Sequence, residues 1–202
     1  MTSALLLARL RTLLDESSAG FWTEDEAYRA LADGQNEIVN IVLQRNPSNQ
    51  ILKTLWKTKS GTGVTNQAIS ITDFKELLNA KLAVTTGGDL KPCKVVEYNE
   101  LFVHNKDNSY LNPIVASPVV YVSATTSLGR LVYFEPSSAS SDYTILYITQ
   151  PTELSGTTQP LLPLEAQEAM IVFAFSFLLR KDLRQAEADS AYKIFLDMVG
   201  KL

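Results

Sequence analysis

The sequence predicts an α+β protein in which N- and C-terminal helices form a bundle and an antiparallel β region is inserted between them. Apolar residues recur with the helical period of 3.6 near both ends, and short runs rich in Val, Ile and Tyr occupy the middle. A length of 202 residues favours one domain with a core that needs no disulfides. We therefore expect a single domain over residues 1–202, with a helical segment at residues 1–46, a β insertion at residues 50–150 and closing helices at residues 161–202.

The N-terminal segment predicts two helices. The first, over residues 3–15, has an apolar face of leucines. The second is expected over residues 24–45, because Thr23 and Glu26 form a capping box and Pro47 ends the pattern. Gly34 costs about 1 kcal/mol relative to Ala in this helix, so we expect it to serve the close approach of another helix. Trp22 is expected to anchor the start of the second helix in the core.

The middle of the chain predicts strands and turns. The clearest strands are 118–123, 130–134 and 143–148, and the loops between them suggest an antiparallel meander. Weaker strand candidates are residues 64–71, 81–86 and 94–98. Residues 73–79 are expected to form a short helix and residues 99–102 a single helical turn.

The C-terminal segment predicts two further helices with a corner at residues 180–182. The first covers residues 164–179 and is apolar on most sides, which predicts burial. Its apolar run is about half of the ~20 residues that span a bilayer, so we expect no membrane association. The last helix, over residues 183–201, has an apolar stripe made by Ala188, Ala191, Tyr192, Phe195 and Val199.

Composition limits the possible chemistry. The 18 basic and 22 acidic residues give a net charge of −4, and the lysines are interleaved with acids, so a phosphate-gripping face is not predicted. One cysteine and one histidine exclude an internal disulfide and the usual His/Cys zinc site. We expect no cofactor and no metal.

Candidate catalytic groups are also few. Cys93 and His104 lack the flanking residues of a nucleophile and base, and are expected to be a buried thiol and a surface imidazole. The glycines at 61 and 63 lack the rest of a phosphate-binding loop and predict a hairpin turn. Neighbouring acids, at 15/16, 25/26 and 187/189, are expected to be helix caps or solvated faces. These patterns favour a structural or binding protein over an enzyme.

Three stretches together resemble the tailed-phage head–tail adaptor (head completion or connector) proteins. The first is Leu10–Ile38, with Trp22-Thr23-Glu24 at a helix start and Gln35-Asn36-Glu37-Ile38 within the helix. The second is Pro118–Pro151, whose short strands end in Tyr147-Ile148-Thr149-Gln150-Pro151, similar to the Tyr-x-x-x-Pro exit from the β region of such adaptors. The third is the closing helix pair within residues 169–199. One departure is that many relatives have a Leu-Pro-x-Asp-type element where this chain has Ile71-Thr72-Asp73-Phe74.

This resemblance implies a non-enzymatic component of the virion neck, assembled in the host cytoplasm. Such proteins form a ring of about twelve copies by head-to-tail contacts that close cyclically. The ring lies beneath the portal protein, extends the DNA channel without binding DNA specifically, and is a platform for tail (nozzle) or other neck proteins. This function rests on family likeness and not on a chemical site.

Two surfaces are expected to make contacts with other subunits or with the portal. Trp56 and Lys57 lie in a segment that mixes apolar and basic residues, which is typical of an interface. In the last helix, Tyr192, Phe195 and Met198 place aromatic and thioether surface near the chain end at Leu202. Family members commonly dock on the portal through their terminal helices. The alternatives are a small enzyme or ligand-binding domain with an unrecognised site, or another ring protein of the neck or tail.

Overall fold

A computed structural model describes residues 1–16, 20–62, 69–97, 113–126, 129–136 and 141–202. The chain divides into two compact units, which we describe separately. The helical unit comprises residues 1–55 and 151–202, and the β unit comprises residues 56–150. The α+β class, with helices at both termini and an inserted, largely antiparallel β region, is therefore confirmed.

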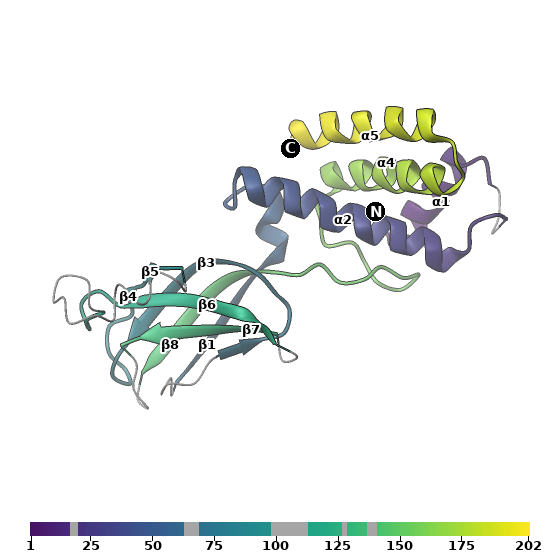
Figure 1. Ribbon diagram of the computed structural model, residues 1–202. Coiled ribbons are helices and arrows are strands. Elements are labelled where there is room, and N and C mark those ends of the chain that lie inside the picture. The colour runs from purple at the N-terminus through teal and green to yellow at the C-terminus, as the bar shows by residue number, and fades with distance from the viewer. Residues whose placement is uncertain (17–19, 63–68, 98–112, 127–128, 137–140) are drawn as a thin grey trace. The chain divides into compact units, whose positions relative to one another are not determined.

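In the helical unit, α4 is the central helix and packs against α1, α2 and α5 (Figure 1). Its central position explains why the sequence of α4 is apolar on most sides. The helices of this unit are α1 (Ser3–Leu13), α2 (Glu24–Arg45), α4 (Leu164–Lys181) and α5 (Gln185–Gly200), with a short 3₁₀ helix, η1 (Gln50–Leu55).

The start of α2 confirms the predicted capping box. The Glu26 amide donates to Thr23 Oγ1 at 3.3 Å, and the Thr23 amide donates to Glu26 Oε2 at 3.2 Å. Trp22, the residue before the cap, is buried as predicted. Further along α2, a Cβ on Gly34 would lie 3.0 Å from the Met170 carbonyl oxygen. Gly34 thus allows the predicted close approach, and the approaching helix is α4.

The β unit consists of two four-stranded sheets, in the orders β1-β8-β3-β4 and β2-β7-β6-β5. Apolar side chains from both sheets form one buried cluster, which includes Leu82, Val132 and Ile145. The strands are β1 (Trp56–Thr62), β2 (Ile69–Ile71), β3 (Phe74–Ala83), β4 (Lys91–Pro92), β5 (Lys94–Val95), β6 (Val119–Thr126), β7 (Gly129–Glu135) and β8 (Asp142–Thr149).

The four predicted helices of the helical unit and the three clearest predicted strands are confirmed, with ends that differ by a few residues. The predicted helix over residues 73–79 is wrong, because these residues belong to β3. Phe74, Leu77 and Leu78 have helix-like spacing, but β3 pairs with β8 through two register shifts, which break the two-residue alternation typical of a strand. The predicted helical turn at 99–102 lies outside the described residues.

The predicted meander is half correct. Strands β6 and β7 form an antiparallel pair, as predicted. Strand β8 is not their neighbour, since it lies in the other sheet between β1 and β3. In addition, β5 pairs with β6 in parallel. These pairings join segments far apart in sequence, and local residue patterns do not encode them.

Candidate functional site

The surface of α5 has a buried face with an exposed apolar side chain on each side of it. Ala188, Phe195 and Val199 are buried within the helical unit. Ile194 is 55% exposed and Leu196 is 40% exposed, and because they are two positions apart on a helix they lie on opposite sides of the buried face. Tyr192, Met198 and Leu202 are half-buried.

Phe195 is a core residue in this structure. None of its surface is exposed, and its ring meets that of Phe173 edge-on with 5.1 Å between centroids. Tyr192 lies beside it, with 5.6 Å between the ring centroids, and carries the Arg180 guanidinium 5.0 Å above its own ring. Phe195 is therefore not accessible at the surface of α5, whereas Ile194 and Leu196 are.

The C-terminus is held against the end of α2. Arg45 Nη1 donates to the Val199 carbonyl oxygen at 3.5 Å, and Asn49 Nδ2 donates to the Leu202 carbonyl oxygen at 3.3 Å. The Val199 carbonyl oxygen also accepts from the Leu202 amide at 3.3 Å, so these side chains add to the bonds that close the end of α5. The end of α5 is thus fixed to its own unit.

Trp56 and Lys57 begin strand β1 in the β unit. Trp56 is half-buried, and its indole Nε1 is buried without an acceptor among the described residues. The Lys57 side chain is 53% exposed, and its Nζ lies 2.5 Å from Asp73 Oδ2. Lys59 donates to the Ser70 carbonyl oxygen at 2.7 Å. The lysines of this segment are therefore engaged within the β unit.

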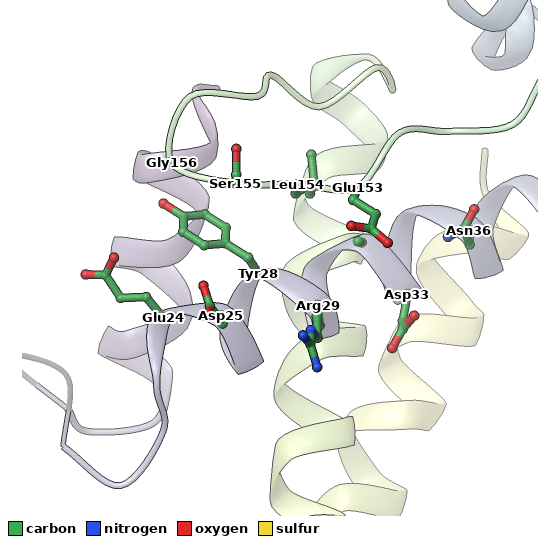
Figure 2. A pocket seen from close by; sticks show the side chains of 11 residues that line it. Glu24, Asp25, Tyr28, Arg29, Asp33, Asn36, Glu153, Leu154, Ser155 and Gly156 are labelled. Atoms are coloured by element: carbon green, nitrogen blue, oxygen red, sulfur yellow. The ribbon is translucent and has the colours of Figure 1, made fainter. Parts of the chain in front are cut away.

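An acidic groove lies between α2 and residues 153–156, with a volume of about 650 Å³ (Figure 2). The carboxylates of Glu24, Asp25, Asp33 and Glu153 line it. In the portion of the chain that the structure describes, none of these four has an ion-pair partner. Burial raises the pKa of the Asp33 carboxyl, and the positive charge of Lys181 opposes this only partly.

The sequence did not reveal this groove, because its walls come from segments more than a hundred residues apart. Glu24 and Asp25 were expected only to serve the first turn of α2, where acidic side chains stabilise the helix. Tyr28 extends toward Gly156, and a Cβ on Gly156 would lie 3.6 Å from the Tyr28 hydroxyl oxygen. The concavity could be recognised only once residues 153–156 were placed beside α2.

Of the candidate catalytic groups that the structure describes, one is a poorly reactive thiol and two have structural roles. Cys93 is half-buried, and burial raises the pKa of its thiol to about 12, so the reactive thiolate is scarce at neutral pH. His104 lies outside the described residues. Glu26 is engaged in its helix cap, where hydrogen bonds from the Thr23 side chain and backbone lower the pKa of the Glu26 carboxyl. Glu187 pairs with Arg184.

Searches for metal and membrane features gave two further findings. Among the described residues, no group of three or more His, Cys, Asp or Glu side chains is arranged to hold a metal ion. No helix within the same described ranges is long and apolar enough to cross a bilayer.

Comparison with known proteins gives a match over the whole chain. The family model described as SU10 adaptor protein matches residues 1–202. No curated protein matches the chain. The family match covers both units, including the β region that lies between the two helical segments.

Proposed function

The chain belongs to the SU10 adaptor protein family, a family of phage head–tail adaptors, and we propose that it forms a ring beneath the portal of a tailed phage. As a member, it is a phage adaptor protein and a virion component. In the proposed role it extends the DNA channel in the neck and provides the attachment platform for tail components. About twelve copies would close the ring through one repeated head-to-tail contact.

The observation that carries this proposal is the family match over all 202 residues. We infer a structural and not an enzymatic role. The engagement of Glu26 in its helix cap, the ion pair of Glu187 with Arg184 and the raised pKa of the Cys93 thiol support this inference.

The exposed apolar side chains of α5 are the proposed docking surface for the portal. Ile194 and Met198 lie one turn apart on one side of the buried face, and Leu196 lies on the other side. Hydrogen bonds from Arg45 and Asn49 hold the end of α5, so these side chains are presented on a fixed support, which reduces the conformational entropy lost on binding. Trp56 and Lys57 remain the proposed subunit contact in the β unit.

The charge distribution supports passage of DNA without specific binding. The helical unit carries 14 acidic and 10 basic residues, and the β unit carries eight of each. A surface that binds DNA neutralises phosphates with clustered Lys and Arg, and neither unit has the excess this needs.

Electron microscopy of the protein mixed with purified portal tests the proposal. We expect a monomer or weak oligomer alone and a ring on the portal, because the exposed large apolar side chains of the described residues are distributed over many elements and form no long run along the chain. A stable dimer that ignores the portal would contradict the proposal.

Point variants are needed to test the docking surface. Deleting residues 194–202 would also remove the buried Phe195 and Val199 and so disturb the core. Ile194→Asp with Leu196→Asp should abolish portal binding and leave the circular dichroism spectrum unchanged. Lys193→Asp, on an exposed position of the same helix, is the matched control and should still bind. Portal binding by the double variant would exclude this surface.

A further inference from the structure

Asp73 lies in the turn between β2 and β3. Its carboxylate accepts three hydrogen bonds from side chains of two other strands. Tyr147 Oη donates to Oδ1 at 3.0 Å, and Thr149 Oγ1 donates to Oδ2 at 2.9 Å. Lys57 Nζ donates to Oδ2 at 2.5 Å. The backbone is also involved, since the Gln150 amide donates to the Asp73 carbonyl oxygen at 2.6 Å.

The four partners stand at the two ends of the β unit. The unit begins at Trp56 and ends at Gln150, so the chain passes between the units twice, at these residues. Lys57 is the second residue after the first crossing, while Thr149 and Gln150 are the last before the second. The two strands concerned are also paired directly, with Lys57 opposite Tyr147.

We propose that Asp73 is a latch that holds the two connections of the β unit together, so that they act as one paired stem. With the latch closed, neither connection can fray without breaking bonds to Asp73. With it open, the ends of β1 and β8 are held together only by their own ladder, in which Trp56 lies opposite Ile148. The latch also explains two features of the sequence at once, because Tyr147 of the Tyr-x-x-x-Pro stretch and Asp73 of the turn form one structure.

The chemistry of the site suits a carboxylate. One short side chain with two oxygens can accept all three bonds, and bonds to an ionised acceptor are roughly twice as strong as neutral ones. Burial raises the pKa of Asp73, but the hydrogen bonds from Lys57, Thr149 and Tyr147 outweigh it, and the net pKa is lowered. The latch is therefore ionised at neutral pH.

Other strained or exposed features point less clearly to a role. Leu183 is exposed, but nothing in its surroundings identifies what would cover it. The acidic groove is lined by four carboxylates together with Arg29 and Tyr28, and nothing in the structure identifies a ligand for it. Asp73 differs from both because its hydrogen-bonding partners are known and lie where the chain enters and leaves the β unit.

Hydrogen exchange read by mass spectrometry or NMR on the whole protein distinguishes a latch from a general stabiliser. In Asp73→Asn, amides at residues 56–59 and 146–150 should exchange about tenfold faster, since loss of a charged hydrogen-bond acceptor is worth at least that factor. Exchange in the rest of the β unit should change little. Local opening and global unfolding are separable by this method.

Two controls are available in the same unit. Glu76→Gln makes the same charge change on an exposed residue of β3 and should leave exchange as in the wild type. Val132→Ala weakens the fully buried core and should accelerate exchange throughout the β unit. If Asp73→Asn behaves like either control, the latch is overturned.

Milder variants keep the proposal testable if Asp73→Asn does not fold. Tyr147→Phe and Thr149→Val each remove one bond to the carboxylate. Each should accelerate exchange at the same residues by a smaller factor, and no local change in either would overturn the proposal. The measurement uses the free protein, so its outcome is independent of portal binding and of the ring.

Discussion

The helical unit and the β unit are stabilised in different ways. Of the twelve largest fully buried side chains among the described residues, nine belong to the helical unit, where they line the faces between helices. The β unit has fewer large buried groups and relies more on strand pairing, together with a polar junction centred on Asp73. Stability from helix packing is visible in the sequence as apolar residues that recur with the helical period. Stability from strand pairing and from the polar junction is not visible there, because it depends on which distant segments of the chain meet.

The largest expected effect tests the apolar side of this comparison. Phe195→Ala should destabilise the helical unit by about 3–5 kcal/mol, because it empties a fully buried aromatic site. Ile194→Ala, one residue earlier and 55% exposed, should change stability by less than about 0.5 kcal/mol. Chemical denaturation followed by circular dichroism measures both. Equal effects would mean that α5 does not pack as described.

A second variant tests the close approach of α2 and α4. Gly34→Ala should destabilise the helical unit by about 1–3 kcal/mol, because the added Cβ would lie 3.0 Å from a backbone carbonyl and the helices must separate. The control is Gly200→Ala, where the nearest atom would be 3.9 Å away. Alanine forms helices better than glycine. If chemical denaturation shows that Gly34→Ala is more stable than wild type, the interface between α2 and α4 accommodates the added Cβ and the prediction is wrong.

These two units also show what a sequence can predict. The boundaries of α2 were predicted because Thr23, Glu26 and Pro47 act locally on the chain. The end of β3 was predicted by the strand candidate at residues 81–86, but residues 74–80 were missed because the register shifts there are set by pairing with β8, some seventy residues later. For the candidate site, apolar excess on α5 was visible in the sequence. The sequence did not show that Phe195 faces inward, because its neighbours at 194 and 196 are equally apolar.

The polar junction gives the β unit a specific pH dependence. The pKa of Asp73 is lowered in the folded state, so its contribution to stability is full above the unfolded pKa of about 4. It is lost as the pH falls through the folded value. At neutral pH the free energy of unfolding of the β unit should therefore be larger in wild type than in Asp73→Asn. As the pH drops, wild type should lose this advantage and the two values should converge. The fluorescence of Trp56 in a Trp22→Phe background follows this difference in urea titrations.

The alkaline side offers an independent check. Burial and the hydrogen bond to Asp73 raise the pKa of Tyr147 to about 12. The protonated phenol therefore stabilises the β unit fully below pH 10, and this stabilisation is lost as the pH rises toward 12. In Asp73→Asn the phenol should titrate closer to 10 by ultraviolet absorbance. An unchanged midpoint would separate Tyr147 from the carboxylate.

The smallest expected effect has the opposite sign and concerns the corner between α4 and α5. Leu183 has φ of 60° and is 90% exposed. The Arg184 amide donates to the Leu179 carbonyl oxygen and the Leu183 amide to that of Arg180, which is the arrangement that favours glycine at position 183. The leucine therefore carries the strain of a left-handed backbone without the benefit of burial.

Leu183→Gly should stabilise the helical unit by about 0.5–1 kcal/mol, as the strain relieved exceeds the added entropy of the unfolded chain. Leu164→Gly is the matched control, since Leu164 is 60% exposed at the start of α4. There glycine should instead cost up to about 1 kcal/mol, because the backbone is helical. The two variants must move the denaturation midpoint in opposite directions. A loss of stability in both would mean that the side chain of Leu183 contributes contacts that offset its backbone strain.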